Sequence, residues 1–196
     1  ATLIGIGGSI LFSMRLGQND KKDAEKILGN CFSTLILFSA ALTLIFLLSK
    51  GMLLHWFGAS DVTYPYANTY LTIYTCGTFF ALLSMGMNYF ITAQGYPLLG
   101  MVTTLIGAIL NIILDPLFIF GIGPFPRMEV AGAAAATVLS QFVSGIGIMV
   151  YYALRFPALR VKRSHMRWDA SILREITSLS LLTCIQQSVM NLGILL

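Results

Sequence analysis

Long runs without a charged side chain constrain this chain more than any other feature. Asp, Glu, Lys and Arg are absent from residues 27–49, 62–114, 130–154 and 176–196. A helix needs about 20 mainly apolar residues to cross the hydrocarbon core of a bilayer, and the second run is long enough for two crossings. Lipid offers no partner to backbone polar groups, which favours helices. The sequence therefore predicts an all-α membrane protein, a polytopic transmembrane helix bundle.

The composition agrees with this fold class. The chain is 57% hydrophobic and 10% charged, whereas about a quarter of the residues in a soluble domain are charged. The sequence begins and stops inside apolar runs, so we expect an internal piece of a longer, transporter-sized polypeptide. We expect about six spanning segments, near 1–16, 28–49, 67–93, 97–120, 130–154 and 172–196.

Most of the positive charge falls in two polar stretches, 15–27 and 155–171. An excess of Lys and Arg in membrane-protein loops marks the cytoplasmic side. We therefore expect a multi-pass protein of the plasma or inner membrane with both loops in the cytoplasm. This placement makes the lipid bilayer the expected partner and argues against nucleic acid. Asp169, just before the last apolar segment, is expected to cap a helix.

Asp115 is the only acidic residue well inside an apolar segment, and it is followed at once by Pro116. Insertion scales put the cost of an Asp at the bilayer centre at about 2.5–3.5 kcal/mol, so such residues usually face a bundle interior or a wet cavity. Asn111 lies four positions earlier and therefore projects from the same helix face. Proline removes a backbone donor and bends a helix. The pattern predicts a small polar pocket around Asn111 and Asp115.

An alternative is that Asp115 marks a helix end among the lipid headgroups. A helix that begins at Pro97 would place Asp115 about 27 Å along its axis, nearly across a bilayer. Depth alone therefore leaves both interpretations open. Single polar residues such as Asn88 and Thr137 more often join helices than bind ligands, and they matter here only if they face Asp115. No nucleophile–base pair or metal cluster is visible, so we expect neither an enzyme nor a bound cofactor.

Four stretches resemble the multidrug and toxic compound extrusion family, within the wider superfamily of polysaccharide and lipid-precursor exporters. They are "GGSILFSMRLGQNDKKDAEKILGN", "ITAQGYP", "GAILNIILDPLFIFG" and "VAGAAAATVLSQ". The resemblance implies a fold of twelve helices in two six-helix lobes, of which this chain would be about half. Residues 1–154 would be the second to sixth helices of the amino-terminal lobe, 155–171 the basic inter-lobe loop, and 172–196 the first helix of the other lobe. The missing remainder of the polypeptide is then an expected partner.

The resemblance also implies a cation-binding site in the amino-terminal lobe. Asp115, Asn111 and Asn88 match its acid and amides, and Thr137 matches its hydroxyl if "GPFPRM" contains a short loop insertion. A second Asp of that site belongs to the first helix of the family, which precedes this chain. Carboxylate, amide and hydroxyl oxygens suit Na⁺, by analogy with other hard cations, and the same acid would carry a proton. The residues leave H⁺ and Na⁺ open as the coupling ion.

The implied function is a cation-coupled multidrug efflux antiporter that exports amphipathic, mostly cationic organic compounds by alternating access. One alternative is a lipid-linked oligosaccharide or lipid-precursor flippase of the same superfamily. Such a flippase would need a cationic cavity to bind pyrophosphate. No Lys or Arg lies well inside the apolar segments, which disfavours this alternative. Another alternative is a non-transporting membrane scaffold, which would leave Asp115 unexplained.

Overall fold

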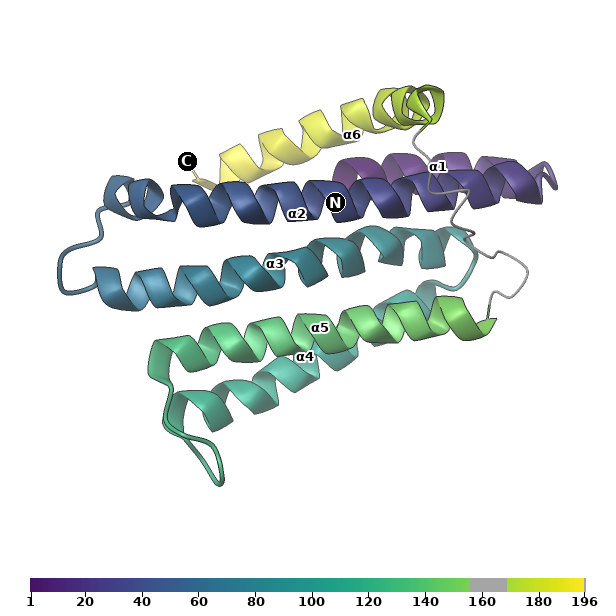
Figure 1. Cartoon of the computed structure of the whole chain (residues 1–196). Coiled ribbons are helices and arrows are strands. Elements are labelled where there is room, and N and C mark those ends of the chain that lie inside the picture. The colour runs from purple at the N-terminus through teal and green to yellow at the C-terminus, as the bar shows by residue number, and fades with distance from the viewer. Residues whose placement is uncertain (156–168, 196) are drawn as a thin grey trace. The chain divides into compact units, whose positions relative to one another are not determined.

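The computed structural model describes residues 1–155 and 169–195, which form helices joined by short connections (Figure 1). Within these ranges there are six helices and no strand, so the predicted all-α membrane fold is confirmed. The helices are α1 (Thr2–Gly17), α2 (Lys21–Trp56), α3 (Tyr64–Ala93), α4 (Pro97–Phe120), α5 (Glu129–Arg155) and α6 (Ala170–Leu195).

The helix bounds agree with the predicted segments to within about three residues except at α2, which begins before residue 28 and ends at Trp56, well beyond the predicted end at 49. Its first turns contain charged residues, and the sequence predicted these as part of the loop 15–27. That extent was wrong, because only residues 18–20 lie between α1 and α2. Asp20 explains the early start, since its Oδ1 accepts a hydrogen bond from the backbone N–H of Asp23 at 3.1 Å and so caps the helix. The predicted loop 155–171 falls mostly on residues 156–168, outside the described residues.

Four of the described helices are long and apolar enough to cross a membrane, namely α2, α3, α4 and the part of α5 up to Tyr151. We expected six spans. The helix α1 has 16 residues, about 24 Å, which is less than the hydrocarbon thickness of about 30 Å. The helix α6 is longer but is less hydrophobic than the other helices, because its sequence contains polar residues such as Gln186 and Asn191. Length and hydropathy therefore account for four of the six expected spans.

The helices pack into two compact units. Unit 1 comprises Ala1–Leu37, Met85–Gly100 and Val150–Leu196, and unit 2 comprises Phe38–Ser84 and Met101–Met149. In unit 1, α1 packs against α2, α3 and α6 through glycines. A Cβ added at Gly8 would lie 2.8 Å from the Phe90 ring, so only a glycine lets the helices come this close.

Unit 2 holds most of α4 and α5 together with parts of α2 and α3. The rings of Phe80 on α3 and Phe142 on α5 meet edge to face, with centroids 4.8 Å apart. A Cβ added at Gly132 on α5 would lie 2.6 Å from the carbonyl oxygen of Phe118 on α4. The backbones of α4 and α5 therefore approach each other closely, three residues from Asp115.

Asp169 caps α6, as the sequence predicted. Its Oδ1 accepts hydrogen bonds from the backbone N–H of Ser171 at 2.9 Å and from the Ser171 hydroxyl at 2.5 Å. These bonds favour the ionised carboxylate, and they lower the pKa of Asp169 below its ordinary value of 3.8, with a smaller contribution from the charge of Lys26. The stability of the first turn of α6 therefore depends on pH.

We expect the first turn of α6 to fray in acid. Because the pKa is lowered in the folded state, the cap stabilises the turn at pH values above 3.8 and stops doing so as the pH falls through the lowered value. Hydrogen exchange at the Ser171 amide, corrected for intrinsic exchange rates, measures this. The Asp169→Ala variant should show the frayed behaviour at every pH. Protection that stays constant through this range in the unsubstituted protein would contradict the expectation.

Candidate cation-binding site

Asn111 and Asp115 lie one turn apart on α4 and contact each other. The Asn111 amide Nδ2 donates a hydrogen bond to Asp115 Oδ1 at 3.3 Å. The helix begins at Pro97 and continues through Pro116 to Phe120, so it does not end at the acid. Because Pro116 has no N–H, the carbonyl of Ile112 loses its usual intrahelical donor. The pair therefore lies inside a helix, next to a weakened turn.

Thr137 on α5 joins this pair. The same Asn111 Nδ2 donates to Thr137 Oγ1 at 3.4 Å, while the Thr137 hydroxyl donates to the carbonyl of Ala133 at 3.0 Å. The hydroxyl hydrogen is thus engaged within α5, and the oxygen is left to accept from Asn111. The close approach of the two helices at Gly132 brings Thr137 within reach. The Asn111 amide bridges α4 and α5.

The oxygens of this bridge are candidate ligands for a small cation. The side chains of Asn111, Asp115 and Thr137 are half-buried. The Asn111 NH₂ group donates to one carboxylate oxygen of Asp115 and to the hydroxyl oxygen of Thr137. The same two oxygens would attract a positive ion. A rotation of the Asn111 side-chain amide by half a turn would place its oxygen where its nitrogen now lies. Three hard oxygen ligands from two helices would then face one point.

Asn88 is the fourth predicted site residue, and it belongs to unit 1. Its Nδ2 donates to the carbonyl of Gly100 at 3.0 Å, which ties α3 to the first turn of α4. Three of the four predicted residues therefore meet within unit 2, and Asn88 has a different partner. A role in cation binding stays a prediction for all four.

Gly132 sets the distance between α4 and α5 beside the site. One residue with a notable contact was missed by the sequence reasoning. Asn30 on α2 is only 2% exposed although it is polar. The signal for Asn30 was available, because it is an amide within the uncharged run 27–49. Nothing in the run itself indicates its partner.

Comparisons with known proteins agree on one family. The family model MatE matches residues 1–117. The multidrug export protein MepA of Staphylococcus haemolyticus is 30% identical over 177 residues, which are 89% of this chain and 38% of that protein. An FAD transporter of Shewanella oneidensis is 29% identical over 171 residues, with 85% and 38% covered. This chain therefore spans less than half the length of these relatives.

A solved structure supports the fold. The crystal structure of MATE in the bent conformation matches with a TM-score of 0.88, over 99% of this chain and 43% of that one. The sequence identity is 24%, so this likeness bears on the arrangement of the helices. The likeness therefore shows that this chain has part of that all-helical fold.

Proposed function

We propose, since this chain belongs to the multidrug and toxic compound extrusion (MatE) family, that the full-length protein exports amphipathic organic cations in exchange for H⁺ or Na⁺. The observation that carries this proposal is the Asn111 amide held between Asp115 and Thr137 on two neighbouring helices. The multidrug export protein MepA, which is 30% identical, supports the choice of cargo.

Ion binding at this place would change how α4 and α5 are joined. Without an ion, the Asn111 amide links the two helices through its hydrogens. A proton on Asp115 removes the charge that attracts the amide, and a Na⁺ ion requires the amide to turn its oxygen inward. Occupied and empty sites therefore favour different arrangements of the helix pair. An ion drives a conformational change only by such a difference in affinity between two states.

The carboxylate of Asp115 inside α4 supports a cationic cargo, because it attracts positive charge. Lys50, towards the end of α2, donates from its Nζ to the hydroxyl of Thr72 at 2.8 Å and keeps its own positive charge. The relatives differ in cargo, since one is an FAD transporter and FAD is anionic. Offering FAD beside an organic cation in an efflux assay therefore distinguishes the two cargo classes.

Efflux from proteoliposomes tests the proposal. The full-length protein would be reconstituted with ethidium as the organic cation, and either a pH gradient or a Na⁺ gradient would be imposed. We expect ethidium to move against its gradient with one of the two ions. FAD and a lipid-linked pyrophosphate, offered in place of the dye, distinguish the other cargo classes. No dye movement with either gradient would overturn the proposal.

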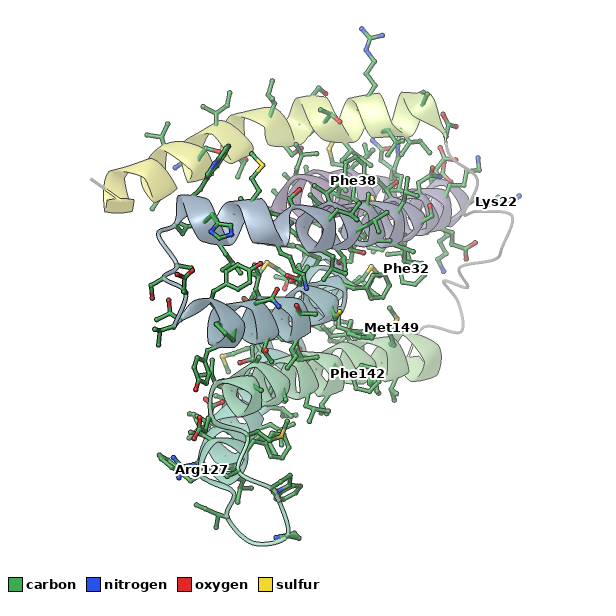
Figure 2. All side chains as sticks on the ribbon, turned by 60° about the vertical axis from the view of Figure 1, so that its left-hand side comes forward. Lys22, Phe32, Phe38, Arg127, Phe142 and Met149 are labelled. Atoms are coloured by element: carbon green, nitrogen blue, oxygen red, sulfur yellow. The ribbon has the colours of Figure 1, made fainter. Side chains whose placement is uncertain are left out.

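We also propose that the basic stretches of the sequence, 15–27 and 155–171, face the cytoplasm, on the basis of their Lys and Arg residues. Lys22 is exposed at the start of α2 (Figure 2), and Val62 is exposed between α2 and α3. In a background without the native cysteines, Lys22→Cys in intact cells should resist a membrane-impermeant maleimide until the cells are permeabilised. Val62→Cys should react at once. The reverse pattern would contradict this topology.

A further inference from the structure

The start of α6 is attached to α2 by one buried amide. The Oδ1 of Asn30 accepts a hydrogen bond from the backbone N–H of Asp169 at 2.9 Å, and its Nδ2 donates to the carbonyl of Lys26 at 3.0 Å. The two residues are 139 positions apart. Asn30 therefore holds the residue that begins α6 against the first turns of α2.

This link depends on the backbone of Asp169 and not on its charge. The Asp169 side chain is exposed and is engaged with Ser171, whereas Asn30 is almost fully buried. A buried amide that loses its partner is costly unless water replaces that partner. Lys26, one turn before Asn30, is exposed, so water can reach the junction once α6 lifts. A bond of this kind can break and form again at low cost.

A second contact holds α6 about two turns farther on. Gly7 of α1 packs directly against Ile176 and Ser180 of α6, both fully buried. A Cβ added at Gly7 would meet the backbone carbonyl of Ile176 and would lie 2.9 Å from the Cβ of Ser180. Figure 1 shows α1 and α6 side by side. The glycine contact sets how close α6 lies, and the amide sets where its first turn sits.

We propose that Asn30 is a latch that holds α6 against α1 and α2 in one state of the transport cycle and releases it in another. The inference rests on the proposed function, and on the resemblance described above, which implies that α6 is the first helix of the second lobe and that transport occurs by alternating access. The latch joins a helix of each lobe at the membrane surface, where water compensates the broken bond. Asn30 acts by positioning α6 and touches neither the ion nor the cargo.

The distance between α2 and α6 tests the latch. Spin labels at Lys22 and Arg174, both exposed, would be placed in the full-length, otherwise cysteine-free protein in nanodiscs. Pulsed electron–electron double resonance then gives the populations of short and long distances between the two labels. We expect Asn30→Leu to raise the long-to-short ratio about five- to tenfold, which is the effect of one net hydrogen bond. Thr34→Val removes a buried hydroxyl that donates to the Asn30 carbonyl but spares the latch, so it should leave the ratio unchanged.

Two substitutions at Asp169 separate the latch from the helix cap without altering a buried side chain. Asp169→Ala removes the cap but keeps the backbone N–H that donates a hydrogen bond to Asn30 Oδ1. Asp169→Pro removes both, because proline has no N–H. The proline variant should reproduce the shift seen with Asn30→Leu, and the alanine variant should keep the unsubstituted ratio. Equal ratios in the two variants would overturn the latch.

The glycine contact gives an independent check. Gly7→Ala should also favour the long distance, because a backbone carbonyl cannot move aside as a flexible side chain does. Gly17→Ala on the same helix is the matched control, since no atom lies within 4 Å of its added Cβ. These distances do not depend on transport. Failure of the latch would therefore leave ion-driven efflux intact, whereas failure of the proposed function would appear in efflux alone.

Discussion

Replacing Asp115 with asparagine is expected to abolish ion-driven efflux by the full-length protein while membrane insertion stays intact. Asparagine has nearly the same shape and its oxygen can still accept from the Asn111 amide, so the α4–α5 bridge survives. It cannot take up a proton, and it offers no net charge to Na⁺. Ethidium efflux from proteoliposomes should fall to the rate of protein-free vesicles under either gradient.

The matched control for this substitution is Asp61→Asn, which makes the same change at an exposed carboxylate in the α2–α3 loop. Its efflux should equal that of the unsubstituted protein. Thr137→Val supplies a finer test, because it removes an oxygen but no charge. It should weaken a Na⁺-driven exchange more than a proton-driven one. Normal efflux by the Asp115→Asn protein would remove this residue from the coupling mechanism.

Substituting Gly132 by alanine is expected to destabilise the protein by about 1–3 kcal/mol, the usual cost of overpacking. The added methyl group would lie 2.6 Å from the carbonyl carbon and oxygen of Phe118 and 2.9 Å from the nitrogen of Ile119. All three atoms belong to the backbone of α4, so the helices must separate. Separation would also pull Thr137 away from Asn111, and efflux should fall together with stability.

Gly145→Ala is the control on the same helix. Its Cβ would lie 3.7 Å from the Cβ of Ser84, which is an ordinary contact, and alanine is the better helix former by about 0.8–1.0 kcal/mol. This variant should be as stable as the unsubstituted protein or more so. Thermal unfolding of the full-length variants in detergent gives the comparison. If the two variants unfold at the same temperature, the close approach of α4 and α5 at Gly132 is not tight.

The error in the bounds of α2 has an identifiable physical cause. The charged residues at the start of α2 suggested a loop, yet Lys and Glu are good helix formers and Asp20 caps the helix just before them. For Asn88, the structure shows a hydrogen bond from its amide to the carbonyl of Gly100, and its part in the cation site stays a prediction.

The amino-acid sequence by itself determined that this chain forms membrane helices, where α4 begins and ends, and that Asn111 and Asp115 share one face of it. These properties follow from hydropathy, from helix periodicity and from residues that are near neighbours in the chain. Only the tertiary structure decided that Thr137 meets Asn111 and that Asn30 holds Asp169. Such contacts depend on how each helix is rotated and how closely its glycines let a neighbour approach, and residues far apart in the chain carry no local signal of either.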